Sequence, residues 1–206
     1  MRLRIGLAIS VVFIQAAFAG QPCAVCHPRE TAGFEKTAMA HSLSAISVPP
    51  EGTFHDPFSG TTFETRSLPS GDWQRLRRPG ESETVQLKYV IGSGAHAFGF
   101  LAQIGNHLFQ SPIAYYTVRH AWGMAPGYQG ALRPNFSRPV TLECLTCHSD
   151  RPRAVADTVN SYLDPPVAGG GIQCERCHGD VSQHLKRPVP GSIINPAKLP
   201  VAARDS

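Results

Sequence analysis

The chain has 206 residues, of which 42% are hydrophobic and 17% are charged. This balance excludes a disordered chain, and the length suits one domain or two small ones. The formal charge is only +4 and no long basic run occurs, so nucleic acid is not an expected partner.

The first 19 residues have the layout of a secretory signal. Arg2 and Arg4 precede an apolar run from Ile5 to Ile14, and Ala17-Phe18-Ala19 forms the cleavage site. The run is short for a membrane span, and an uncleaved anchor is the alternative. We therefore expect a periplasmic or otherwise exported chain that begins at Gly20 and has no membrane span after signal cleavage.

Residues 20–48 are expected to form a helical segment around the first of three similar cysteine motifs. It opens with Cys23-Ala-Val-Cys26-His27, and Pro28 suits the first position of a helix. The side chains that follow recur at the spacing of one helical face, at Phe34, Ala38, His41 and Ala45. This spacing predicts a helix that continues past His41.

Residues 49–128 are expected to form a β-rich insertion, a small antiparallel sheet. Residues 85–91 alternate between apolar and other side chains, and Gly105-Asn106 has the sequence of a hairpin turn between residues 96–104 and 107–118. Weaker strand candidates are residues 61–68 and 72–78, with turns expected at 54–60 and 68–71.

Residues 129–206 contain two more motifs, Cys144-Leu-Thr-Cys147-His148 and Cys174-Glu-Arg-Cys177-His178. All six cysteines of the chain thus occur in pairs, and each pair is followed by histidine. This is the attachment signature of c-type haem. Two thiols can form thioethers to the vinyl groups of one porphyrin, and the histidine can then bind its iron. We expect three covalent c haems with His27, His148 and His178 as proximal ligands.

Two other classes of protein site also use Cys-x-x-Cys pairs. Structural zinc sites do so, but zinc does not require a histidine after each pair, and these pairs do not resemble one finger. Thioredoxin-like redox pairs need a βαβ context, which this sequence lacks. Haem attachment is therefore the favoured interpretation.

Three further histidines are candidate distal ligands. On a helical path His184 lies about 9 Å along the axis from His178 and on a different face, so it should bind a haem other than the one on Cys174 and Cys177. We expect that haem to be the one on Cys23 and Cys26. His41 lies about 21 Å from His27 on such a path, and His96 follows a glycine-rich loop that permits close approach. The remaining candidates are expected to be solvated or structural: His55, His107, His120 and Met124.

The sequence resembles multihaem cytochromes of the cytochrome c-552/c-554 type, and especially exported ones that carry this domain ahead of tetratricopeptide repeats. The resemblance rests on the segments CAVCHPRETAGFEKTAMAHS, YVIGSGAHAFGFL, WGMAPGYQ, CLTCHSD and CERCHGDVSQH. It implies electron transfer and mostly bis-histidine ligation, with a histidine placed like His184 serving a neighbouring haem. Such domains usually carry a fourth motif shortly after a segment like INPAKLPVAARDS, so this chain is expected to be a truncated form.

Together these features predict an α+β, haem-packed cytochrome with short helices around the haem motifs. The expected function is electron transfer to and from redox partner proteins, without catalysis. One alternative is a haem enzyme with one open iron site that acts on small nitrogen species. Another is an interaction module of a larger protein, in which haems act as covalent staples.

Overall fold

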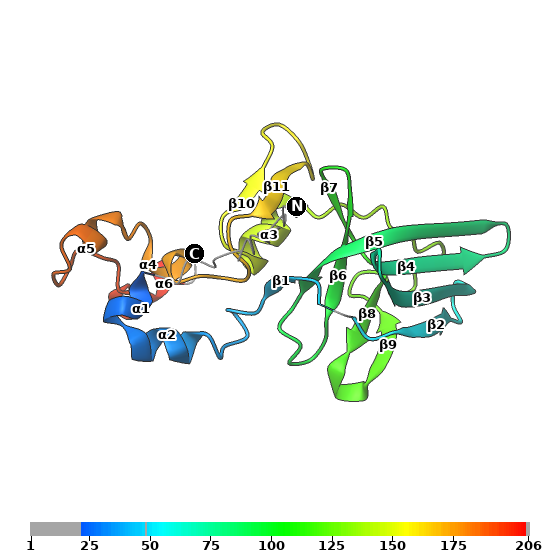
Figure 1. The fold of residues 1–206 in the computed structure, drawn as a ribbon, viewed down its shortest axis with the longest axis horizontal. Helices are drawn as coiled ribbons and strands as arrows, with labels where there is room; N and C mark the ends of the chain where they lie inside the picture. The colour runs from blue at the N-terminus through cyan, green and yellow to red at the C-terminus, as the bar shows by residue number, and fades with distance from the viewer. Residues whose placement is uncertain (1–21, 48, 205–206) are drawn as a thin grey trace, which may run out of the picture.

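The computed structural model describes residues 22–47 and 49–204, and it has an α+β fold (Figure 1). The signal predicted at residues 1–19 lies outside the described residues. Strands gather at one end of the molecule, which we call the sheet lobe (residues 43–124). Helices gather at the other end, which we call the helical lobe (residues 22–41 and 171–204) (Figure 1). Residues 142–167 lie between them.

The helices are all short. The α-helices are α1 (Cys23–Cys26), α2 (Pro28–Phe34), α3 (Leu142–His148), α4 (Glu175–His178), α5 (Ser182–Lys186) and α6 (Val201–Arg204). Two 3-10 turns are η1 (Thr117–Arg119) and η2 (Pro196–Lys198). Helices of this length are not stable alone in water, so neighbouring groups must stabilise them.

The strands of the sheet lobe are antiparallel. They are β1 (Leu43–Ala45), β2 (Gly52–Asp56), β3 (Thr61–Leu68), β4 (Gly71–Arg78), β5 (Glu81–Ile91), β6 (Gly99–Ile104), β7 (His107–Gln110), β8 (Ile113–Tyr116) and β9 (Ala121–Met124). The main sheet has the order β2-β3-β4-β5-β6-β7, with β1 also paired to β5. Separate hairpins are formed by β8 with β9, and by β10 (Pro152–Ala154) with β11 (Tyr162–Val167).

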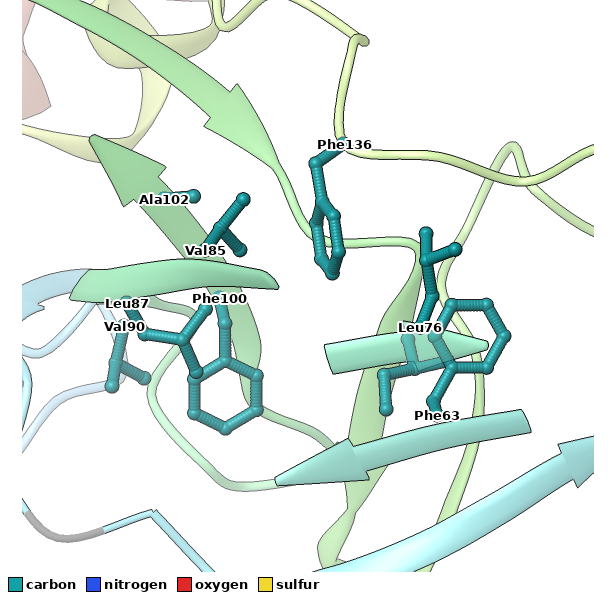
Figure 2. Close-up of a cluster of buried hydrophobic side chains, with 9 residues drawn as sticks. Phe63, Leu76, Val85, Leu87, Val90, Phe100, Ala102 and Phe136 are labelled. Atoms are coloured by element: carbon teal, nitrogen blue, oxygen red, sulfur yellow. The ribbon is translucent and has the colours of Figure 1, made fainter. Parts of the chain in front are cut away.

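The core of the sheet lobe is a cluster of buried side chains that Figure 2 shows between the strands. Phe63 and Leu76 are directly opposite one another on β3 and β4, and both are fully buried. Fully burying an apolar side chain of this size stabilises a fold by about 1.5–3 kcal/mol. The other members are Val85, Leu87, Val90, Phe100, Ala102, Ile113 and Phe136.

A bulge in β5 changes which residues face this core. The pairing of β5 with β6 shifts between Leu87 and Tyr89. The simple alternation predicted for residues 85–91 is therefore broken, and Val90 rather than Tyr89 joins Leu87 in the core. Tyr89 packs instead on a second cluster, which links the sheet to α3 and β11. One strand thus contributes to two cores.

Several local predictions hold and others are wrong. The two residues Gly105 and Asn106 connect β6 to β7, as predicted, and Gly105 has a φ of 61° that favours glycine. The weaker candidates at 61–68 and 72–78 are strands β3 and β4. The turn predicted at 54–60 is wrong in its first half, because residues 54–56 belong to β2, which pairs with β3.

The helix predicted to pass His41 ends at Phe34. Residues 35–42 form turns, and the following residues pair with β5 as strand β1. Tertiary pairing with the sheet therefore overrides the helical spacing of the apolar residues. The path from His178 to His184 is not one helix either, because Gly179 separates α4 from α5 with a φ of 71°.

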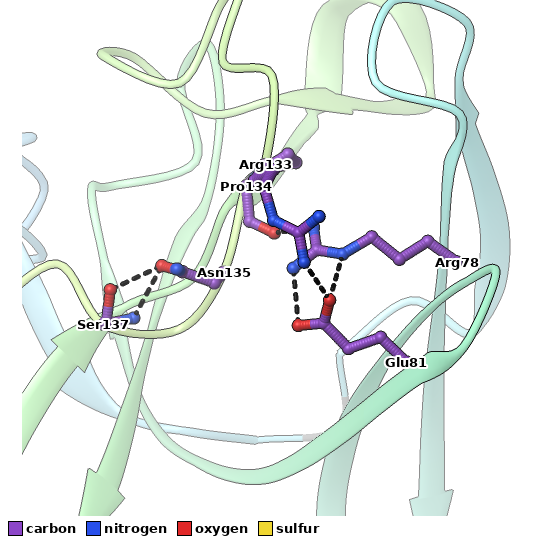
Figure 3. Close-up of polar contacts among 6 residues, drawn as sticks. All are labelled: Arg78, Glu81, Arg133, Pro134, Asn135 and Ser137. Carbon is purple, nitrogen blue, oxygen red and sulfur yellow. Dashed lines mark hydrogen bonds and ion pairs between the residues drawn. The ribbon is translucent and has the colours of Figure 1, made fainter.

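An ion-pair network ties the β4–β5 hairpin to the segment that leads to α3. The Arg78 guanidinium donates two hydrogen bonds of 2.7 Å to the Glu81 carboxylate and a third, of 3.0 Å, to the Pro134 carbonyl (Figure 3). Arg133 donates to the same carboxylate at 2.6 Å. Next to it, Asn135 Oδ1 accepts from the backbone N–H and the hydroxyl of Ser137 (Figure 3).

Candidate haem sites

The first and third Cys-x-x-Cys-His motifs line one cavity in the helical lobe. Its volume is about 610 Å³, within the roughly 300–1,000 Å³ range of small-molecule and cofactor sites. The motif residues that line it are Cys23, Cys26, His27, Cys174, Cys177 and His178. Apolar side chains complete the wall, among them Phe34, Met39, Val181, Leu185, Ile193 and Ile194.

His184 faces His27 across this cavity. Their ring centroids are 6.3 Å apart, and the ring planes differ by only 20°. Two imidazoles on opposite sides of one iron, each with nitrogen about 2 Å from the metal, have centroids roughly 6 Å apart. The turn at Gly179 brings α5 into this position, which the sequence alone did not specify.

Two hydrogen bonds orient the imidazoles of the cavity. His178 Nδ1 lies 2.8 Å from the Ile194 carbonyl. His184 Nδ1 lies 2.8 Å from Ser192 Oγ, and the Ser192 hydroxyl donates to the Val189 carbonyl at 2.7 Å. Both Nδ1 atoms can therefore carry their proton and donate it, which leaves Nε2 free as a metal ligand. Sequence reasoning missed Ser192 and Ile194, because no local motif marks them.

The cavity brings the first and third motifs close together. Burial, and secondarily the nearby Cys23, raise the pKa of the Cys174 thiol to about 11. The two thiols belong to motifs about 150 residues apart in the chain. Their proximity is therefore a product of tertiary folding.

The helical lobe has almost no buried amino acids. Among residues 22–41 and 171–203, only Thr31 and Gly171 are buried. Four thiols, three imidazoles and an apolar wall thus surround a cavity of cofactor size in a lobe that lacks a core of its own side chains. These residues fit a covalently attached porphyrin.

The second motif packs against the rest of the protein in a different way from the first. It forms α3, and Leu145, between its two cysteines, is fully buried in the cluster that links α3 to the sheet. Ala24, at the corresponding position of the first motif, is only partly buried, and the next residue, Val25, is 84% exposed. Burial lowers the pKa of His148, which favours the neutral imidazole that binds metals. Cys144 and Cys147 are exposed.

His41 and His96 do not line the cavity. Both are exposed. His41 Nε2 lies 2.7 Å from the Glu35 carbonyl, so that nitrogen is already engaged. His96 lies in the loop between β5 and β6, and its carbonyl accepts from the Thr117 backbone N–H.

The histidines expected to be solvated or structural, and Met124, lie in the sheet lobe. His55 is in β2 rather than in a turn, and its ring contacts the Thr62 hydroxyl at 3.2 Å. His107 begins β7 and contacts Ser161 Oγ at 3.1 Å. His120 follows η1 with a left-handed φ of 48°. Met124 ends β9 and packs against the main core.

Two further observations concern metals and membranes. Within the part of the chain that the structure describes, no three His, Cys, Asp or Glu side chains are grouped so as to hold a bare metal ion. The helices in residues 22–47 and 49–204 are all too short to cross a bilayer.

The segment with the second and third motifs is similar to a known protein family. Residues 124–179 match the family model described as cytochrome c554 and c-prime. The chain also resembles the crystal structure of outer cell wall cytochrome OcwA, with a TM-score of 0.50 and 14% identity, over 84% of this chain. It spans only about a third (34%) of the length of that structure, and the likeness concerns the fold. Among curated proteins, none matches the sequence.

The matched segment carries Cys144, Cys147, Cys174 and Cys177 with the histidine that follows each pair. It ends before His184 and does not include the first motif. The resemblance to c-554-type cytochromes is thus confirmed for residues 124–179, and the fold of the chain resembles that of a cytochrome.

Proposed function

We propose that the protein is an exported electron carrier with three covalently attached c haems. The observation that carries the proposal is the shared cavity, in which two Cys-x-x-Cys-His motifs converge and His184 faces His27 at 6.3 Å. When bound, haem supplies an iron that accepts and releases one electron.

The chain's own residues would hold and orient that group. Cys23 and Cys26 would attach the first haem, and His27 and His184 would bind its iron. Cys174 and Cys177 would attach the third, and His178 would bind its iron. Ser192 and the Ile194 carbonyl keep the Nδ1 protons of His184 and His178 in place. The apolar wall excludes water, which lowers the local dielectric constant around the irons.

Cys144 and Cys147 attach the second haem, with His148 as its proximal ligand. His41 and His96 remain candidates for distal ligands of the second and third haems. For His41 this would require ligation through Nδ1, or release of the contact between Nε2 and the Glu35 carbonyl. The first site already has His184 as its second ligand in this scheme.

An electron carrier suits this arrangement better than an interaction module does. Two attachment sites in one cavity allow electron exchange between close irons. A module whose haems only cross-link the chain does not need its irons to be close. Redox partner proteins would donate and accept the electrons. Export supplies the compartment for such a protein and follows from the signal predicted at residues 1–19.

Intact-mass measurement of the mature holoprotein tests the proposal. We expect a chain that starts at Gly20 and carries three added haems. A variant with Cys23→Ala and Cys26→Ala should carry two. A mature wild-type protein that holds zinc or disulfides in place of covalent porphyrin would contradict the proposal.

A further inference from the structure

Ser42 lies where the two lobes meet, and its hydroxyl contacts the surroundings of all three motifs. The residue is only 9% exposed. Ser42 Oγ lies 2.7 Å from the carbonyl oxygens of both Met39 and His148. It also accepts a hydrogen bond of 3.2 Å from the backbone N–H of Ile172.

These three partners belong to different haem segments. Met39 follows the first motif and lines its cavity, His148 is the histidine of the second motif, and Ile172 lies two residues before Cys174. The single hydroxyl hydrogen can be donated to either carbonyl, while the oxygen accepts from Ile172. A buried hydroxyl with this set of partners constrains all three segments relative to one another.

The backbone of the same residue is attached to the sheet. The Ser42 carbonyl accepts from the Gly92 N–H at 2.7 Å, and the next residue, Leu43, pairs with Ile91. Ser42 therefore connects the end of β5, the helical lobe and α3. None of the attachment or ligand roles proposed for the three haems involves Ser42.

Close packing on both sides leaves little freedom at this junction. The Ile172 N–H also bonds the Met39 carbonyl, at 3.1 Å. A Cβ atom at Gly171 would lie 2.5 Å from the Ala40 carbonyl oxygen and 2.8 Å from that of Met39. Only glycine permits the two backbones to approach so closely.

We propose that Ser42 is a positioning residue that sets the orientation of His148 and the placement of the second haem relative to the other two. This inference rests on the proposed function. The hydroxyl bonds the carbonyl of the residue whose side chain would bind iron, and it ties that residue to the segment that leads into Cys174. Groups around a metal site fix the orientation of its ligands and tune the metal, and Ser42 would do so by fixing the backbone from which the His148 imidazole extends.

The test compares Ser42→Ala with Ser44→Ala, an exposed serine two residues away on β1. Intact mass first establishes that each holoprotein carries three haems. Spectroelectrochemistry and low-temperature electron paramagnetic resonance then measure the midpoint potential and the ligand-field signal of each haem. A variant with Cys144→Ala and Cys147→Ala identifies the second haem by its missing signal.

We expect Ser42→Ala to retain three haems and to shift the potential and the signal of the second haem, while Ser44→Ala matches wild type. Gly171→Ala keeps the hydroxyl but pushes Met39 and Ala40 away, and it should shift the same haem. If Ser42→Ala does not acquire its haems, Gly171→Ala provides the test of the proposal.

The proposal is overturned if the folded variants melt at lower temperature but keep the wild-type potentials and signals, because Ser42 would then only stabilise the fold. Fewer than three haems on the wild-type protein would refute the proposed function instead.

Discussion

At the scale of single residues, the histidines divide by what their ring nitrogens contact. His178 and His184 each engage Nδ1 with an oxygen acceptor, which leaves Nε2 for iron. His41 engages Nε2 itself, with the Glu35 carbonyl. Position in the sequence does not separate these cases, since His41 and His184 both follow a motif histidine. The hydrogen-bond partner makes the difference, and it comes from a loop or turn elsewhere in the chain.

His184→Ala should convert one of three haems from low spin to high spin, because it removes the imidazole that faces His27. Low-temperature electron paramagnetic resonance of the oxidised protein measures the change. His120→Ala, which alters an exposed histidine outside the helical lobe, is the control and should leave every signal unchanged. Identical spectra for His184→Ala and wild type would remove His184 from the ligand set.

Ser192→Ala should raise the midpoint potential of the haem on Cys23 and Cys26. Loss of the Nδ1 acceptor makes the His184 imidazole a poorer electron donor, which favours the reduced iron. Redox titration followed by optical absorption measures the shift. If all potentials stay at their wild-type values, the bond between His184 and Ser192 does not tune the iron.

At the scale of elements, the three motifs share a sequence pattern but pack against the rest of the protein in different ways. Leu145 makes the second motif part of the hydrophobic cluster beneath the sheet, whereas the first motif has the partly buried Ala24 at the same place, followed by the exposed Val25. The third motif has the polar Glu175 at that place. The second motif is therefore fixed to the sheet, whereas the other two line one cavity.

Leu145→Ala should destabilise the protein by about 2–5 kcal/mol, the usual cost of truncating a fully buried leucine. The control is Val25→Ala, at an exposed apolar residue between the two cysteines of the first motif, which should change the free energy of unfolding by less than about 0.5 kcal/mol. Denaturant unfolding of the two holoproteins measures both values. Equal changes in the free energy of unfolding at the two positions would contradict the proposed difference in how the two motifs are packed.

Glu81→Gln should lower thermal stability at neutral pH but have little effect in acid. Hydrogen bonding and charge from Arg78 hold the pKa of the Glu81 carboxyl below its ordinary value of 4.5. Its stabilising contribution is therefore complete above that value and is lost as the pH falls through the lowered pKa. Melting curves of variant and wild type at several pH values measure this, and a difference that persists after Glu81 is protonated would count against it.

At the scale of the whole molecule, the two lobes are stabilised in different ways. The sheet lobe has its own hydrophobic core (Figure 2). The helical lobe has helices of four to seven residues and only two buried residues among 22–41 and 171–203. Covalent haem would supply the apolar core that this lobe needs, and cytochrome maturation would then complete the fold.

The chain made without haem attachment should keep its sheet and lose its helical lobe. Hydrogen exchange should show protected amides in β3 to β6 and fast exchange across residues 22–41 and 171–204. The holoprotein, in which both regions should be protected, is the reference. Strong protection of the helical lobe in the haem-free chain would show that it folds without the cofactor.

The sequence by itself determined the features that depend on neighbouring residues. The three Cys-x-x-Cys-His motifs predict attachment chemistry, Pro28 marks the start of α2, and Gly105-Asn106 marks a hairpin, because each is a local covalent or steric requirement. Helix geometry and the family resemblance both predicted that His184 serves a haem other than that of its own motif. The continuous helix assumed in that prediction is wrong, because Gly179 separates α4 from α5.

Only the tertiary structure decided the features that join distant segments. Pairing of β1 with β5 ended the predicted helix before His41, and the bulge near Leu87 placed Val90 in the core. Convergence of His27 with His184, and of three segments on Ser42, unites residues up to 157 positions apart. Such contacts form when whole helices and strands pack together. The energy of this packing depends on surfaces from distant segments, and a local pattern of side chains does not specify which surfaces meet.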